Sequence, residues 1–439
     1  MEQTSMSGTE LRRLLFVSYL YPPMVAGGVP RVFQFSKYLP EFGWAPTVLT
    51  GPALGAEAVD EGALRELPPC VEIVRAPCPL AAHGPRGAPN PRTGLSGLPR
   101  RAARLAMRLV LVPDRQVLWV AHAVRAGLRA LRRARHEVIL ATYGPGSNLL
   151  VGRRLAELSG LPLVLDFRDL WSDVPQPVFA TGLHRALAGR FERRAVAAAR
   201  RVVAVSEPMA AHLAERHRRR PEEFAAITNG FDPADLARVR DARAGPGRPF
   251  RLGFTGSLYG GRDLGPFLDA LAGLRREGAL SPDTFRVEFV GNFPPEEAER
   301  RGLADLVECR PHVPHAGVFE VFARADALMV IEAPGYWAQF SYAAKVFEYL
   351  LAGKPILALV EPGGNSARLL EAVGLGRIAH PADRAAIRAA LLELLKLKGA
   401  PPKPVDISRP PLCDFDRRRL TGRLAAVLAA AAAPDGPRR

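Results

Sequence analysis

The stretch LLFVSYLYPPMVAGGVPRVFQF, residues 14–35, decides the fold. Its apolar beginning, Leu14 to Tyr19, has the length and composition of a buried strand. A loop rich in proline and glycine follows, and apolar residues then recur at helical spacing from Val32 to Phe42. The stretch therefore predicts a strand, a glycine turn and a helix.

The same alternation continues along the chain, interrupted by a polar, glycine-rich passage. Strands that alternate with helices favour parallel sheets, so we expect an α/β fold of two successive doubly wound domains, with a ligand cleft between the carboxyl ends of their strands. The expected parts are a first domain (1–232), a linker (233–249), a second domain (250–412) and a C-terminal helix with a tail (413–439) that returns to the first domain. The further apolar runs interpreted as strands are 71–74, 138–140, 161–167, 201–206, 225–230, 251–257, 285–291, 306–309, 327–331 and 354–360.

The 439 residues, 48% of them hydrophobic, carry a formal charge of +16. This composition excludes a disordered chain. Residues 75–135 hold thirteen arginines and one acidic residue, Asp114, which is a net charge of +12. If this segment is helical, four of the arginines share one arc of about 100° beside leucines. Such a helix lies either in an anionic membrane interface or on an ordinary protein surface. The four arginines are Arg100, Arg101, Arg104 and Arg108.

The cysteines and the apolar runs indicate the compartment. Cys70, Cys78, Cys309 and Cys413 show no CxxC spacing, so neither a zinc site nor a disulfide framework is expected. The first ten residues have no apolar run of the kind that a signal peptide needs. We therefore expect a cytoplasmic protein, peripheral on the inner face of the plasma membrane if the basic segment binds lipid.

Two motifs in the first half have the chemistry of a ligand site. Gly27 and Gly28 stand between a strand and a helix, where backbone N–H groups face an anion; the alternative is a tight turn with no ligand. The block DFRDLWSD, 166–173, follows an apolar strand, the position at which parallel sheets contact ligands. Arg168 and Asp169 are its candidate site residues, although a buried Asp–Arg pair that only joins two loops is also possible.

Two motifs in the second half suit a diphosphate. TGSLYGGRDL places Gly256, Ser257 and Arg262 between a strand and a helix, and a cation on a glycine-rich loop is a typical phosphate ligand. Lys345 and Glu348 are three residues apart on one helical face, where they bind a phosphate and a ribose or form a surface ion pair.

Taken together, these motifs resemble the retaining GT-B glycosyltransferases of group 1 (family 4), and the resemblance runs nearly end to end. The stretch KVFEYLLAGKPIL, 345–357, is the most specific part. The resemblance implies the GT-B fold, with two doubly wound Rossmann-like domains that face each other across a cleft. It implies a nucleotide-diphosphate-sugar donor bound mostly by the second domain and an acceptor bound by the first. It also implies transfer without a metal ion or another cofactor, since positive side chains replace the divalent cation.

The resemblance gives roles to single residues. Arg262 stands where the family has a catalytic lysine that neutralises the diphosphate, and Glu348 matches the ribose-binding second glutamate of the EX7E motif. Arg168, followed by Asp169, falls near a histidine beside the donor sugar. Gly27 and Gly28 match the loop that closes on the diphosphate.

The chain departs from the family at two positions of the donor site. Phe340 occupies the position of the first EX7E glutamate, and Ser257 replaces a common arginine. Lys345, shared with a subset of the family, supplies the missing phosphate contact in this interpretation.

The sequence therefore predicts a retaining hexosyltransferase that moves a sugar to a glycan or lipid-linked acceptor in cell-surface polysaccharide synthesis. The alternatives are a sugar-nucleotide epimerase of the same architecture and a catalytically silent scaffold in a polysaccharide assembly complex. A nucleic-acid binder is disfavoured, because the 7% of aromatic residues do not alternate with basic ones.

Overall fold

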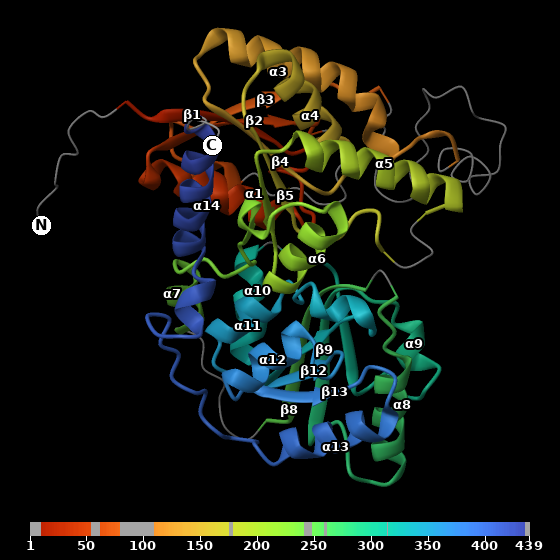
Figure 1. Cartoon of the computed structure of the whole chain (residues 1–439). Coiled ribbons are helices and arrows are strands. Elements are labelled where there is room, and N and C mark those ends of the chain that lie inside the picture. The colour runs from red at the N-terminus through yellow and green to blue at the C-terminus, as the bar shows by residue number, and fades with distance from the viewer. Residues whose placement is uncertain are drawn as a thin grey trace, which may run out of the picture. The chain divides into compact units, whose positions relative to one another are not determined.

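The computed structural model describes residues 10–53, 62–79, 109–174, 179–240, 248–258, 261–313 and 315–434. The chain divides into two compact units, each with its own sheet (Figure 1). The first unit combines residues 1–228 with residues 418–439, and the second unit is 229–417.

The first unit is built on seven parallel strands in the order β3-β2-β1-β4-β5-β6-β7. Because every described strand pair is parallel, the carboxyl ends of these strands lie along one edge of the sheet. The strands are β1 (Arg12–Val17), β2 (Trp44–Thr50), β3 (Glu72–Arg75), β4 (Val138–Thr142), β5 (Leu163–Phe167), β6 (Arg201–Ala204) and β7 (Phe224–Ala226), and the helices are α1 (Val29–Tyr38), α3 (Val120–Arg133), α4 (Ser147–Ser159), α5 (Gly182–Ala198), α6 (Glu207–His217) and α14 (Arg417–Ala432).

The C-terminal helix α14 packs on the core of the first unit. Leu420, Leu424 and Leu428 are fully buried in one apolar cluster with Phe16 of β1 and Phe35 of α1. The spacing of four between these leucines places them on one helical face, which explains why a helix so distant in sequence is held there.

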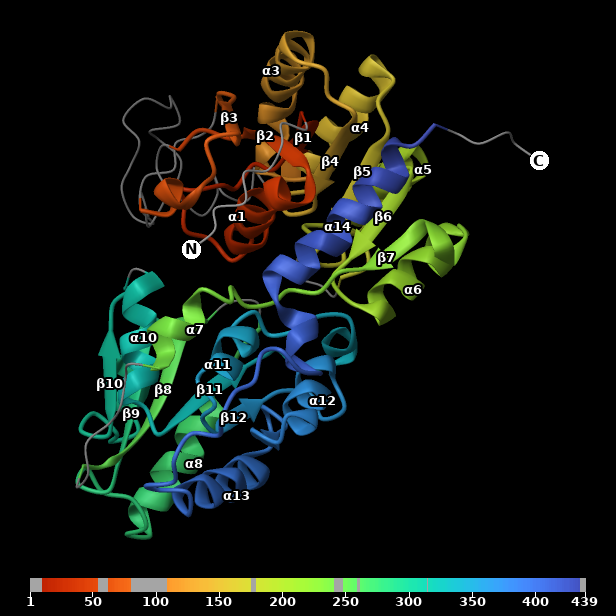
Figure 2. The ribbon, with the colours of Figure 1, turned by 90° about the vertical axis from the view of Figure 1, so that its left-hand side faces the viewer.

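The second unit has six parallel strands in the order β10-β9-β8-β11-β12-β13. Separate apolar clusters cover its two faces, one with α8 and α13, which lie side by side (Figure 2), and the other with α10, α11 and α12. The strands are β8 (Phe250–Ser257), β9 (Phe285–Asn292), β10 (Val307–Arg310), β11 (Ala327–Ile331), β12 (Ile356–Leu359) and β13 (Gly376–Ala379), and the helices are α7 (Asp235–Arg240), α8 (Gly265–Arg276), α9 (Glu296–Glu299), α10 (His315–Arg324), α11 (Val346–Leu351), α12 (Asn365–Ala372) and α13 (Arg384–Leu395).

Two strands and one helix differ from the sequence prediction. β2 and β13 were not predicted: β2 contains Pro46, a residue unusual in a central strand, and β13 has only four residues. The expected linker, 233–249, contains α7, whose Leu236 and Val239 pack on the second core. The two apolar side chains stabilise a short helix within this polar passage.

The arginine-rich segment lies largely outside the described residues, which resume at Leu109. Its predicted helix and the four arginines on it therefore have no structural account here. None of the helices in the described ranges is both long and apolar enough to cross a membrane.

A buried ion pair joins three elements at the carboxyl edge of the first sheet. Arg31, in the first turn of α1, contacts Asp166 of β5 at 2.7 Å, and both side chains are at most 2% exposed. The guanidinium also donates to the backbone oxygens of Ile227 (2.8 Å) and Thr228 (2.9 Å), which follow β7, while Thr142 donates to Asp166 at 2.8 Å. Asp166 is thus a structural residue in an Asp–Arg pair, the alternative that the sequence left open.

Removing Arg31 should destabilise the protein strongly. An Arg31→Ala variant leaves the Asp166 carboxylate buried without its cation, so we expect a loss of about 3–5 kcal/mol in the free energy of unfolding of the first unit, measured by chemical denaturation. Arg154→Ala, which removes a half-exposed ion pair with Glu157, is the matched control and should cost about 1 kcal/mol or less. Equal losses in the two variants would contradict the structural role of the buried pair.

Candidate functional site

In the first unit, Arg168 lies against the glycine loop. It follows β5, and its guanidinium donates to the backbone oxygens of Tyr143 (2.9 Å) and Gly144 (3.3 Å). A Cβ atom placed on Gly28 would lie 1.5 Å from Arg168 Nη1, so only glycine leaves room for this side chain. The structure thus brings together Gly28 and Arg168, two of the predicted site residues.

Asp169 and Gly27 are exposed beside this contact. Burial raises the pKa of Tyr143, and the negative charge of Asp169 raises it further, which places the carboxylate near the phenol. Tyr143 stacks on Trp171 with ring centroids 5.7 Å apart. The exposed Asp169 side chain therefore lies near a pair of stacked aromatic rings.

A charged network that the sequence did not reveal holds the loop after β5. The buried Glu192 of α5 accepts a hydrogen bond from the backbone N–H of Ser172 (2.7 Å) and contacts His217 of α6 (3.0 Å). Burial would raise the pKa of Glu192, but these hydrogen bonds hold it below its ordinary value. Asp173 contacts His212 at 2.8 Å in the same region. Only the fold reveals these pairs, because the partners are 20 or more residues apart in the sequence.

In the second unit, Lys345 and Glu348 form an ion pair of 3.0 Å at the start of α11. Burial alone would raise the pKa of Glu348, but Lys345 and then His315 hold it below its ordinary value. Burial would likewise lower the pKa of Lys345, and the charge of Glu348 raises it instead. Both groups are therefore charged.

His315, at the first residue of α10, extends this charged cluster. Its Nε2 lies 3.9 Å from an oxygen of Glu348 and 3.9 Å from an oxygen of Asp235. Burial raises the pKa of Asp235 to about 6, although the charge of His315 opposes the shift. Neither Asp235 nor His315 was predicted: Asp235 lay in the expected linker, and only the fold brings His315 to Glu348.

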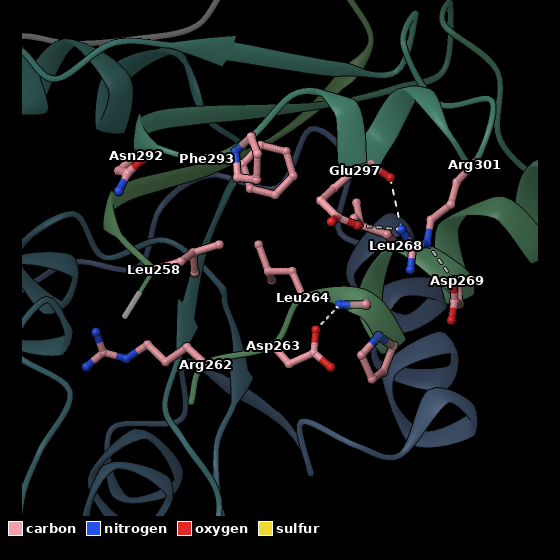
Figure 3. A pocket seen from close by; sticks show the side chains of 13 residues that line it. Leu258, Arg262, Asp263, Leu264, Leu268, Asp269, Asn292, Phe293, Glu297 and Arg301 are labelled. Atoms are coloured by element: carbon pink, nitrogen blue, oxygen red, sulfur yellow. Dashed lines mark hydrogen bonds and ion pairs between the residues drawn. The ribbon is translucent and has the colours of Figure 1, made fainter. Parts of the chain in front are cut away.

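Arg262 lies on the loop between β8 and α8, at the edge of a pocket of about 720 Å³ (Figure 3). Leu258, Leu264 and Phe293 form apolar walls. Figure 3 shows the Arg262 guanidinium directed away from the ion pair between Arg301 and Glu297. The pocket thus has a cation at one side, apolar walls, and an ion pair at the other side.

Gly256 has a structural role at the carboxyl edge of the second sheet, where the backbone conformation favours glycine. Its φ of +140° suits glycine, and a Cβ on Gly291 of the paired strand would lie 1.9 Å from the Gly256 oxygen. The requirement for glycine is therefore explained by the close approach of β8 and β9. The neighbouring Ser257 side chain lies outside the described residues.

Phe340 is buried among aromatic rings. It is 5% exposed, and its ring centroid lies 5.0 Å from that of Tyr336 and 6.4 Å from that of Trp337. A side chain with no hydrogen-bonding group in this position cannot do the work of a carboxylate, which agrees with the departure noted in the sequence.

Glu332, immediately after β11, was also not predicted. Burial raises its pKa to about 7, and a hydrogen bond from Ser366 and the charge of Arg262 offset this shift in part. The strand-end signal that selected the block after β5 was also present here, because Glu332 directly follows the apolar run 327–331.

The comparisons with known proteins agree with this architecture. Residues 25–235 match the model of Glycosyltransferase Family 4. No curated protein matches significantly in sequence.

Many solved structures share the fold. A glycosyltransferase from Rickettsia africae ESF-5 has a TM-score of 0.60 at 12% identity, covering 96% of this chain and 99% of that one. Anabaena Alr3699/HepE, solved in complex with UDP, has a TM-score of 0.57 at 16% identity, with 96% and 100% covered. WaaG, a glycosyltransferase involved in lipopolysaccharide biosynthesis, has a TM-score of 0.56 at 16% identity, with 95% and 98% covered.

The two doubly wound units and these neighbours define a protein of the GT-B fold, as the sequence predicted. Over residues 25–235, the chain is similar to the glycosyltransferases of family 4. The roles of the individual site residues stay predictions.

The raised pKa of Glu332 gives a pH-dependent test of its environment. Between its ordinary value of 4.5 and about 7, the folded protein keeps a proton on Glu332 that the unfolded chain has lost, so stability falls as the pH rises through this window. Glu332→Gln has no such proton. We therefore expect the variant to gain stability relative to wild type between pH 5 and pH 8, measured by denaturant titration.

The exposed Glu320→Gln is the control and should show no such trend. A constant difference in stability between Glu332→Gln and wild type across this pH range would contradict the raised pKa of the buried Glu332 carboxyl.

Proposed function

We propose that this protein transfers a hexose, with retention, from a nucleotide-diphosphate-sugar to a glycan or lipid-linked acceptor in cell-surface polysaccharide synthesis. The match to family 4 supports glycosyl transfer. One structural neighbour was solved with UDP, and another takes part in lipopolysaccharide biosynthesis, which supports the donor and acceptor classes.

The observation that carries the proposal is the pair of cationic sites in the second unit. Arg262 lies on the loop after β8, and Lys345 pairs with Glu348 at the start of α11. In this proposal Arg262 and Lys345 bind the diphosphate and Glu348 accepts hydrogen bonds from the ribose. The transfer needs no metal ion, because these side chains carry the positive charge.

The chemistry follows from where charge develops. As the bond between sugar and diphosphate breaks, negative charge grows on the leaving phosphate, and a fixed guanidinium stabilises that transition state more than the bound donor. Gly27 and Gly28 would contribute backbone N–H groups from the first unit. Arg168, held against Gly28, and Asp169 would then lie beside the transferred sugar.

Replacing Arg262 tests the proposal most simply. We expect Arg262→Ala to lower turnover on the order of 10²-fold, the usual effect of removing one electrostatic group from the transition state. The measurement is release of nucleoside diphosphate from a nucleotide sugar in the presence of a lipid or glycan acceptor. Arg276→Ala, on the exposed side of α8, is the control and should leave turnover unchanged.

Near-normal turnover in Arg262→Ala would contradict the assignment. Donor consumption without any acceptor would favour an epimerase, and binding of a nucleoside diphosphate with no turnover would favour a silent scaffold.

The arginine-rich segment fits a membrane-borne acceptor and a cytoplasmic protein peripheral to an anionic membrane. Where the described chain resumes, Leu109 and Val110 are 45% and 76% exposed. Apolar side chains next to a basic segment suit the interface of an anionic bilayer.

Liposome flotation tests this membrane proposal. We expect the protein to float with anionic vesicles at low salt and not with neutral ones, since the attraction is electrostatic and screened by salt. Arg100→Ala/Arg101→Ala should weaken flotation, whereas Arg276→Ala/Arg300→Ala in the second unit should not. Failure of the wild-type protein to bind anionic vesicles at low salt would contradict the membrane proposal.

A further inference from the structure

Glu332 holds a buried acceptor atom without a partner. The residue is 8% exposed, and its backbone N–H donates to the oxygen of Leu359 at 3.0 Å, which fixes it at the end of β11. Its carboxyl accepts a hydrogen bond from Ser366, but Oε2 has no partner among the described residues. Leaving a buried acceptor unpaired costs about 1–3 kcal/mol, so such an atom calls for an explanation.

Asn365, next to Ser366, has a buried donor atom that also lacks a hydrogen-bond partner. It is the first residue of α12 and is 5% exposed. Its Oδ1 accepts from Arg368 at 2.7 Å, while its Nδ2 has no acceptor within the described chain. An unpaired acceptor and an unpaired donor therefore lie at neighbouring points of the same sheet edge, because Glu332 follows β11 and α12 follows the adjacent β12.

The amino end of α12 adds backbone donors at this position. Its N-cap, Gly364, has no side chain that could accept a hydrogen bond from the first backbone N–H groups. The Ser366 hydroxyl, which accepts from the N–H of Ala343 at 2.9 Å, joins the helix start to Glu332. A helix of eight residues thus begins beside a buried, partly unpaired carboxyl.

The loop that carries Arg262 borders this group. A Cβ on Gly261 would lie 3.8 Å from the Cβ of Ala333, the residue after Glu332, and the Arg262 charge acts on the Glu332 carboxyl. A ligand bound by Glu332 would therefore be adjacent to a phosphate held by Arg262.

An unpaired acceptor beside an unpaired donor indicates which class of ligand would bind here. A phosphate takes only donors, and a carboxylate beside it is repulsive. A sugar ring presents hydroxyl groups that both donate and accept, so it completes the acceptor and the donor together.

We propose that Glu332 and Asn365 form the subsite for the transferred sugar, with the Glu332 carboxylate accepting a hydrogen bond from one hydroxyl and Asn365 Nδ2 donating to another oxygen. Glu332 would then supply the carboxyl group for the sugar that Phe340, a side chain without a hydrogen-bonding group, does not have. This inference rests on the proposed function, because it assumes a nucleotide-sugar donor whose diphosphate binds Arg262.

The test separates the sugar from the nucleotide. Isothermal titration measures the affinity of the full chain for UDP, GDP, UDP-glucose, UDP-galactose, UDP-N-acetylglucosamine and GDP-mannose. For the nucleotide sugar that wild type binds best, we expect Glu332→Gln to lose about tenfold in affinity, because the amide is a weaker, uncharged acceptor and its NH2 group replaces one acceptor oxygen. Affinity for the matching nucleoside diphosphate should stay within about twofold of wild type.

Two further variants sharpen the test. Asn365→Ala should show the same selective loss, and it carries the test if Glu332→Gln does not fold. The exposed Glu320→Gln is the matched control and should bind every ligand as wild type does.

The outcomes distinguish the inference from the function beneath it. A loss shared equally by nucleotide sugar and nucleoside diphosphate, or no loss at all, would overturn the subsite and leave the transferase proposal in place. If wild type binds none of these nucleotides, the proposed function fails and the subsite fails with it.

Discussion

The buried contact between Arg31 and Asp166 is the interaction on which the functional edge of the first unit depends. Its guanidinium joins the first turn of α1, the end of β5 and the residues after β7, all within hydrogen-bonding distance. Because both charges are buried, neither can be lost without leaving the other uncompensated. Gly28, three residues before Arg31, and Arg168, two residues after Asp166, are therefore held where they meet.

The second unit uses buried charge differently. Lys345 and Glu348 compensate each other, and His315 joins Glu348 to Asp235. Glu332 is only partly compensated, and an unpaired atom remains. Fully paired charges hold a site in shape, whereas an unpaired buried group marks a place where a ligand completes the hydrogen bonds. The Lys345–Glu348 pair is therefore held in shape before a ligand binds, whereas Glu332 keeps an acceptor atom that only a ligand would pair.

Much of the fold was predictable because strands and helices alternate in hydrophobic pattern, and each apolar run interpreted as a strand overlaps one in the structure. β2 was missed because Pro46 interrupts its pattern, and α7 because two apolar residues in a polar passage give little periodicity. In the site, loops with glycine pointed to Gly28 and Arg262. Glu332 and Asn365 were missed because an unpaired hydrogen-bonding atom becomes visible only when its neighbours in space are known. The contacts of Glu192 with α6 could not be predicted from the sequence for the same reason.

The proposed function depends on the second unit binding the nucleoside diphosphate of a sugar donor. A crystal structure of the protein with the nucleoside diphosphate that binds it most tightly tests this directly. We expect diphosphate oxygens about 3 Å from the Arg262 guanidinium and a ribose hydroxyl hydrogen-bonded to Glu348. A nucleotide bound away from both residues would contradict it.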